Sequence, residues 1–224
     1  MELHLFSVGD ADQDLRPVME ACKQLLEGRT EVSVAFLPLG SLGVNRLLEE
    51  TRKLFHHLAE IELVDAETME LPAMEMILRK AALAYIPDGN AYLLNHRLNL
   101  SRLAPYLQKK IQSGLPVVAV GAGAVACGPN ILTADALNLV PTSYFNGLAV
   151  TPFNLHVHYV DDIERDAWLA DYHTFHDNPV ILLEDGASLR MHGKTTSLEA
   201  GAGWCLRPRQ EKQRLTIGEP IPVN

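Results

Sequence analysis

The sequence predicts an α/β fold: a doubly wound, mostly parallel sheet with helices on both faces and a C-terminal antiparallel strand extension. Over the first half, short apolar runs alternate with amphipathic stretches of helical period, which is typical of βαβ crossovers. Residues 117–120 are apolar throughout, as in a strand that is buried on both faces. The last third contains short strand-like runs separated by Gly-containing turns, which favours antiparallel pairing.

The first half supplies the parallel sheet. Its predicted strands share a short apolar core and span residues 3–8, 32–37, 60–64, 82–86 and 117–120. The predicted helices between them place apolar residues on one face and span residues 15–26, 44–58, 73–80, 90–94 and 103–111. Gly28 is expected to cap the first helix at its C-terminal end, and residues 9–12 are expected to form a turn.

The second half is predicted with shorter elements. A short helix is expected over residues 125–127, turns over 138–146, a helix over 162–172, and strands over 148–151, 155–159, 180–183, 188–191, 195–198 and 204–207. No repeat or linker interrupts the chain, so residues 1–224 are expected to form one domain, with residues 208–224 as a loosely held polar tail.

Composition limits the function classes. Of 224 residues 47% are hydrophobic, which is enough for a sizeable core, and the formal net charge of −9 argues against a nucleic-acid or anionic-membrane surface. Cys22, Cys127 and Cys205 follow no metal-ligand pattern and are expected to be buried free thiols. No signal-like start or long apolar run is evident, and we therefore expect a cytoplasmic protein.

The most informative stretch is the elbow segment, residues 116–129, which reads P-V-V-A-V-G-A-G-A-V-A-C-G-P. A buried strand here leads into a turn of small residues and then a helix. This is the arrangement of a nucleophile elbow, in which a sharp turn requires small neighbours and presents its central residue to a site.

The elbow segment resembles that of the dipeptidase E and cyanophycinase family of serine peptidases, which have a glutamine amidotransferase-like fold. The family motif G-x-S-A-G-A falls on residues 119–124, A-V-G-A-G-A, and its nucleophilic serine falls on Gly121. The resemblance also extends to residues 183–186, L-E-D-G, near the C-terminal strands. It implies a serine-type peptidase scaffold in which the nucleophile is missing.

Residues 87–90, P-D-G-N, resemble the family's G-G-G-N turn. By this resemblance the backbone amides of Gly89 and Ala122 form an oxyanion hole, with Asn90 beside them. Pro87 and Asp88 depart from the family pattern, and a carboxylate at Asp88 would oppose a negative ligand. An ordinary strand-to-helix turn, with Asn90 as the helix N-cap, explains the same residues equally well.

Residues 153–159, F-N-L-H-V-H-Y, carry two histidines. If this run is a strand, its period of two puts Asn154, His156 and His158 on one face. The family carries its general base in a P-H-F or P-H-Y segment, so the resemblance makes His158 the relic general base and places His156 near the ligand.

A metal site is the alternative use of these histidines. Two histidines on one strand face can bind zinc, and His173 and His176 form a possible second pair. Nothing in the sequence brings the two pairs together. Solvated or core histidines are therefore favoured, and neither a metal nor another cofactor is expected.

The third member of a triad is poorly defined. Asp135 lies at a plausible distance after the elbow segment, but residues 135–139, D-A-L-N-L, resemble a stretch that follows the family's catalytic aspartate. We therefore expect the acid-bearing loop to be missing. No replacement nucleophile is evident, because Cys127, Ser113, Thr142 and Ser143 are all poorly placed along the chain.

Two classes of function follow. The first is a catalytically inactive peptidase E-like protein that retains a cleft for a small molecule or short, acidic peptide-like ligand, with no nucleic-acid or membrane partner. The second is an active hydrolase of the same family that uses an unrecognised nucleophile or a water held by His156 and His158. The sequence does not define the oligomeric state.

Overall fold

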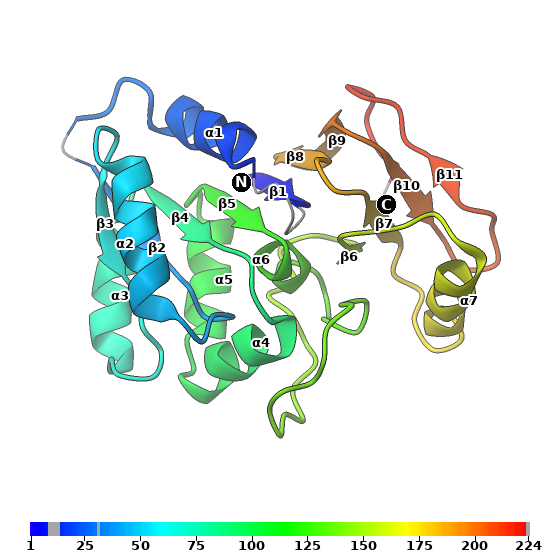
Figure 1. Ribbon diagram of the computed structural model, residues 1–224, viewed down its shortest axis with the longest axis horizontal. Helices are drawn as coiled ribbons and strands as arrows, with labels where there is room; N and C mark the ends of the chain where they lie inside the picture. The colour runs from blue at the N-terminus through cyan, green and yellow to red at the C-terminus, as the bar shows by residue number, and fades with distance from the viewer. Residues whose placement is uncertain (9–13, 31, 223–224) are drawn as a thin grey trace.

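A seven-stranded sheet forms the centre of the molecule (Figure 1). The computed structural model describes residues 1–8, 14–30 and 32–222, and the turn expected at residues 9–12 lies outside them. The strand order is β3-β2-β4-β5-β1-β8-β9. The strands are β1 (Glu2–Phe6), β2 (Ser33–Phe36), β3 (Glu60–Leu63), β4 (Leu83–Ile86), β5 (Val117–Val120), β8 (Ser188–His192) and β9 (Thr195–Ala200). β1 to β5 pair in parallel, while β8 and β9 add an antiparallel edge, which confirms the predicted fold class.

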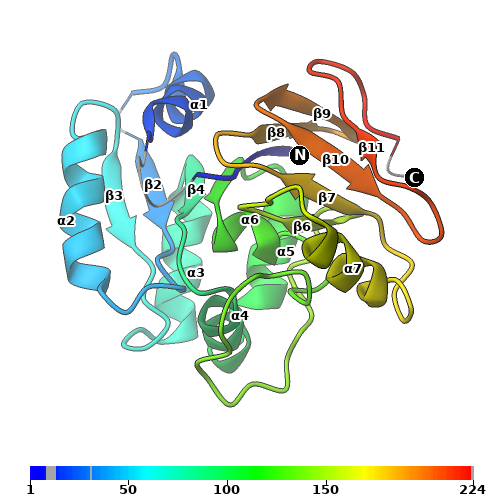
Figure 2. The same cartoon turned by 45° about the vertical axis from the view of Figure 1, so that its right-hand side comes forward.

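Helices cover both faces of this sheet (Figures 1 and 2). On one face, α1 (Arg16–Leu26) and α2 (Val44–Phe55) pack on side chains such as Phe36 and Tyr85. On the other face lie α3 (Leu71–Lys80), α4 (Ala91–Leu100), α5 (Ala104–Gln112) and α6 (Ala122–Ala126). Side chains that alternate along each strand therefore point into two separate apolar layers, one on each face of the sheet.

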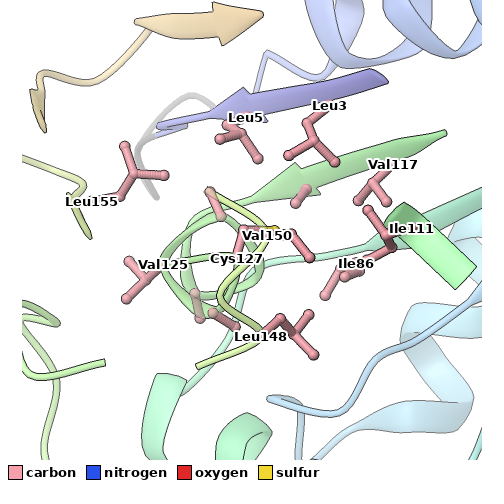
Figure 3. Close-up of a cluster of buried hydrophobic side chains, with 14 of the residues drawn as sticks. Leu3, Leu5, Ile86, Ile111, Val117, Val125, Cys127, Leu148, Val150 and Leu155 are labelled. Carbon is pink, nitrogen blue, oxygen red and sulfur yellow. The ribbon is translucent and has the colours of Figure 1, made fainter. Parts of the chain in front are cut away.

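The elbow segment is built as the sequence predicts, except that its helix begins earlier. α6 follows directly after Gly121 instead of starting at residue 125. Figure 3 shows Val125 and Cys127 within a buried cluster that includes Leu148 and Val150. The small residues of α6 allow this close packing, so the position of the strand-to-helix turn is fixed by the core beneath it.

A second sheet of four strands lies beside the antiparallel edge (Figure 2). Its order is β11-β10-β7-β6, formed by β6 (Asn154–His156), β7 (Val180–Leu183), β10 (Gly203–Leu206) and β11 (Gln213–Arg214). α7 (Ile163–Tyr172) packs on it through Leu169. We expected β7 and β10 in the antiparallel extension, but they pair with each other and with β6 and β11 instead.

Three expectations for the second half were wrong. Residues 148–151, which are described throughout, form no strand. β6 ends at His156, because the chain leaves the extended conformation at His158, whose φ is 56°. The segment after Pro208 is largely exposed but not loosely held, because it contributes β11, donates backbone hydrogen bonds from Gly218 and Ile221 to β9, and buries Ile221.

Two further expectations concern the cysteines and the membrane. Cys22, Cys127 and Cys205 are free and buried, as predicted. Burial raises the pKa of both the Cys22 and Cys127 thiols to about 12, which makes them unreactive at neutral pH. In the described part of the chain, no helix combines the length and the apolar character needed to cross a bilayer.

Candidate active site

A cavity of about 480 Å³ opens at the carboxyl ends of β4 and β5, where ligands of open α/β sheets bind. Most of its wall is apolar, and its polar side chains come from separate segments. The turn after β4 contributes Asp88, the loop after α6 contributes Asp135, and the segment after β6 contributes His158. The cavity therefore joins the elbow segment to the histidine segment.

Gly121 forms the sharp turn between β5 and α6, with φ 53° and ψ −116°. Only glycine adopts a backbone of this kind without strain. A Cβ at this position would collide with the carboxylate of Asp88. The space that a side chain at residue 121 would need is therefore filled by Asp88.

The Asp88 carboxylate is held by two backbone amides. Its Oδ1 accepts hydrogen bonds of 2.7 Å from the N–H of Gly89 and 2.7 Å from the N–H of Ala122. Gly89 packs so closely against the backbone of Gly40 that a Cβ would not fit there. The two amides that the resemblance assigns to an oxyanion hole thus converge on one point, and a carboxylate oxygen of the chain itself occupies it.

His158 lies opposite this carboxylate. The distance from its Nε2 to Asp88 Oδ2 is 3.7 Å, and its Nδ1 lies 2.6 Å from Asp185 Oδ1. Asp185 belongs to the turn between β7 and β8, within the L-E-D-G stretch. The Asp185 carboxylate therefore orients the imidazole, as the acid of a triad orients its general base. The other ring nitrogen faces the Asp88 carboxylate.

A buried serine fixes this arrangement. The Ser7 hydroxyl, at the end of β1, accepts a 2.9 Å hydrogen bond from the backbone N–H of His158 and lies 3.5 Å from Asp185 Oδ1. These contacts hold the left-handed backbone of His158 in place. No local pattern in the sequence identifies Ser7, and the L-E-D-G turn is the one signal in the sequence that points to Asp185.

Electrostatics favour a charged imidazole. Interaction with the Asp88 carboxylate, opposed by partial burial and reinforced by the hydrogen bond to Asp185, raises the pKa of His158 to about 9. At neutral pH the site thus contains one imidazolium between two carboxylates. One positive charge is thus shared between two negative ones, and these three groups together keep a net negative charge.

The other predicted site residues lie apart from this group. His156 is fully buried, its Nδ1 lies 2.8 Å from the carbonyl oxygen of Thr133, and burial lowers its pKa. Because the strand ends between them, His156 and His158 do not share a strand face as we expected.

Asn90 caps α4 by accepting a 2.9 Å hydrogen bond from Leu93 N–H, and its amide donates to the Leu137 carbonyl at 2.8 Å. Gly89, Ala122 and His158 line the cavity, whereas Asn90 and His156 support it.

Asp135 is paired elsewhere. It lines the cavity but forms an ion pair with Arg165 of α7, and among the described residues its carboxylate makes no hydrogen bond to His158. The carboxylate hydrogen-bonded to the imidazole is that of Asp185, which comes from a turn that the resemblance did not assign to a triad. Within the described ranges, no three His, Cys, Asp or Glu side chains gather as a metal site would require.

The sequence as a whole matches a known family. The model of peptidase family S51 matches residues 3–199. The chain belongs to this family. Its relatives include a protein of Drosophila melanogaster named "Probable alpha-aspartyl dipeptidase", to which it is 30% identical over 57% of both chains. Peptidase E of Streptomyces coelicolor is 27% identical over 52% of this chain and 51% of its own length.

The chain thus spans little more than half the length of these two relatives in the aligned regions. The S51 fold itself extends over nearly the whole chain. The crystal structure of a peptidase from an acI-B1 Actinobacterium superposes with a TM-score of 0.72 at 18% identity, covering 98% of this chain and 96% of that one.

Proposed function

We propose that this S51 family chain is catalytically inactive as a serine peptidase, because Gly121 stands where the family nucleophile is expected. The observation that supports this most directly is the Asp88 carboxylate, which fills the space of a side chain at residue 121 and takes both convergent amides. Among the described residues that line the cavity, none is a serine, threonine or cysteine.

In this proposal the cavity is retained as a binding site for a small molecule or short peptide. A volume of about 480 Å³ lies within the range of small-ligand pockets. The acidic character that we expected of the ligand is not favoured, because Asp88 already occupies the two amide donors and Asp135 adds a second carboxylate to the wall. A neutral or cationic ligand fits these charges better.

Loss of the nucleophile has a large effect on rate. Triad enzymes without their nucleophile retain only about 10³–10⁴-fold acceleration over water, from oxyanion stabilisation and binding. Here the amides are also occupied, so even this residual acceleration is reduced. Peptide hydrolysis by the serine mechanism is accordingly expected to be undetectable.

A fluorophosphonate probe, which labels activated serines covalently, tests the proposal. The wild-type chain should remain unlabelled, as should Gly121→Ser alone, because the new side chain collides with Asp88. The double variant Gly121→Ser/Asp88→Gly frees the amides and leaves the His158–Asp185 pair in place. It should be labelled at residue 121 at least ~10²-fold faster than the single variant, the effect expected of restoring oxyanion donors.

Circular dichroism of each variant identifies any that fail to fold, and hydrolysis of a dipeptide amide by the double variant provides a second readout. Stoichiometric labelling of any serine in the wild-type chain would overturn the proposal. So would labelling of Gly121→Ser as fast as the double variant, because Asp88 would then not obstruct that position.

A further inference from the structure

The two oxygens of Asp88 have different surroundings. Oδ1 accepts both amide hydrogen bonds, whereas among the described residues Oδ2 accepts none and lies 3.7 Å from His158 Nε2. This distance is too long for a direct hydrogen bond and leaves Nε2 free to hold a water molecule. One oxygen is thus anchored, and the other is available at a cavity wall beside a His–Asp pair.

We propose that Asp88 is a catalytic nucleophile whose Oδ2 attacks the saturated, electrophilic carbon of a small apolar alkyl halide or epoxide. His158 and Asp185 then hydrolyse the resulting ester. This inference accepts from the proposed function that no serine acts here, and it goes further by assigning Asp88 chemistry of its own.

The cavity suits such a substrate. Its wall includes Leu15, Leu47, Val120, Val125 and Val157, so an apolar body can be buried next to the carboxylate. A carboxylate is a weak nucleophile toward peptide carbonyl groups but forms covalent intermediates when a good leaving group departs from carbon.

In the first step, Oδ2 donates an electron pair to the electrophilic carbon, and the bond from that carbon to the leaving atom breaks. The electron pair of the broken bond goes to the halide, which departs as an anion, or to the epoxide oxygen, which takes a proton from solvent. The product is an ester between Asp88 and the alkyl group. The side chain at residue 88 has then lost its negative charge.

This loss of charge prepares His158 for the second step. The Asp88 carboxylate is the largest influence that raises the pKa of His158, so esterification lowers that pKa and releases the imidazolium proton to solvent. The neutral imidazole can then act as a base. Its Nδ1 remains hydrogen-bonded to Asp185 at 2.6 Å, which keeps Nε2 directed at the ester.

In the second step, water attacks Cγ of the Asp88 ester and gives its proton to His158 Nε2. The charge that develops on Oδ1 is stabilised by the amides of Gly89 and Ala122, which already bind that atom at 2.7 Å. The Cγ–Oδ2 bond then breaks, and Oδ2 leaves with the alkyl group as an alcohol after taking the proton from His158. The water oxygen remains in the Asp88 carboxylate, and its second proton restores the imidazolium.

A matched pair of four-carbon probes, 1-bromobutane and 1,2-epoxybutane, tests this chemistry and distinguishes the two substrate sources. The His158→Gln variant lacks the base and should accumulate one ester per chain, mapped to Asp88 by peptide mass spectrometry, with at least one probe. Its ester hydrolysis should be at least ~10²-fold slower than in the wild type, as expected for loss of a general base. Asp88→Asn should form no ester at this position.

The matched control is Asp171→Asn, which removes an exposed carboxylate of α7 outside the cavity lining and should leave alkylation of Asp88 unchanged. A second measurement needs no variant: during turnover in H₂¹⁸O the wild-type Asp88 carboxylate should gain ¹⁸O. Absence of an Asp88 ester in folded His158→Gln with both probes, together with no ¹⁸O uptake by the wild type, would overturn the inference. Equal alkylation of many surface carboxylates would do the same. Neither result would affect the fluorophosphonate test, so the two proposals can fail separately.

Discussion

The two walls of the cavity are built in different ways. The elbow wall, formed by residues 87–90 and 120–122, follows two adjacent parallel strands and combines small residues, backbone amides and the Asp88 carboxylate that those amides bind. The histidine wall joins Ser7, His158 and Asp185, which are brought together across more than 150 residues of sequence. On the elbow wall, backbone amides that do not titrate hold the Asp88 carboxylate, whereas on the histidine wall the charge of His158 depends on pH.

This difference separates stability from chemistry. At Gly121 of the elbow wall a single added carbon meets backbone strain and a fixed carboxylate, so a substitution there should mainly affect folding. On the histidine wall the His158 and Asp185 side chains are partly exposed, and substitutions of these two residues should mainly change protonation. The following predictions test this division, from the largest expected effect to the smallest.

Gly121→Ala should destabilise the protein by about 2–4 kcal/mol. The substitution places a side chain on a positive-φ backbone and drives its Cβ into Asp88. Adding Asp88→Gly should recover at least ~1 kcal/mol, because the two positions share one space. Urea denaturation of both variants measures their free energies of unfolding. A loss below about 0.5 kcal/mol for Gly121→Ala would show that Asp88 does not fill this space.

Asp88→Asn should lower the pKa of His158 more than Asp185→Asn does. The wild-type value is about 9, and the Asp88 carboxylate contributes more to it than Asp185. NMR titration of the His158 ring in the three proteins measures the order directly. The opposite order would mean that Asp185, rather than Asp88, has the larger influence on the pKa of His158.

The two histidines should affect stability in opposite directions with pH. The folded-state pKa of His158 is raised, so its stabilising contribution is fully present below about pH 6.5 and is lost as the pH rises through about 9. Burial lowers the pKa of His156, so that residue costs stability as the pH falls below its ordinary value of 6.5. Comparing His158→Gln and His156→Gln with the wild type across this range tests both signs; a parallel pH dependence in the two variants would contradict them.

The smallest effect is expected at a contact outside both walls. Lys212 Nζ contacts Asp161, Asp166 and the Tyr159 hydroxyl and so joins the C-terminal segment to α7. Lys212→Met should cost less than about 1 kcal/mol, because partly exposed ion pairs contribute little. A larger loss of stability, measured by thermal unfolding, would mean that this contact contributes strongly to the stability of the second sheet.

The sequence predicts the elbow wall better than the histidine wall, and the reason is physical. Strand 117–120 and the N-cap at Asn90 depend on local patterns, and the structure reproduces both. The end of β6 depends on the positive φ of His158, which Ser7 stabilises from a distant strand. Local periodicity carries no information about that contact, and the predicted strand was therefore too long.

The relation between Asp88 and Gly121 was beyond sequence reasoning for a similar reason. The two residues are neighbours only because β4 and β5 are paired, and their overlap follows from the backbone angles of one glycine. The pairing of Asp185 with His158 likewise depends on where the turn between β7 and β8 meets the end of β1. Such long-range geometry decides what the cavity can do.

The central claim is that the Asp88 carboxylate occupies the two amides at which a serine peptidase would bind its oxyanion. NMR measurement of the Gly89 and Ala122 amide protons in the wild type and in Asp88→Ala tests it most directly. Both protons should resonate downfield in the wild type, as expected for hydrogen bonds of 2.7 Å to a carboxylate, and both should move upfield together in the variant. Unchanged positions of both protons would contradict the account.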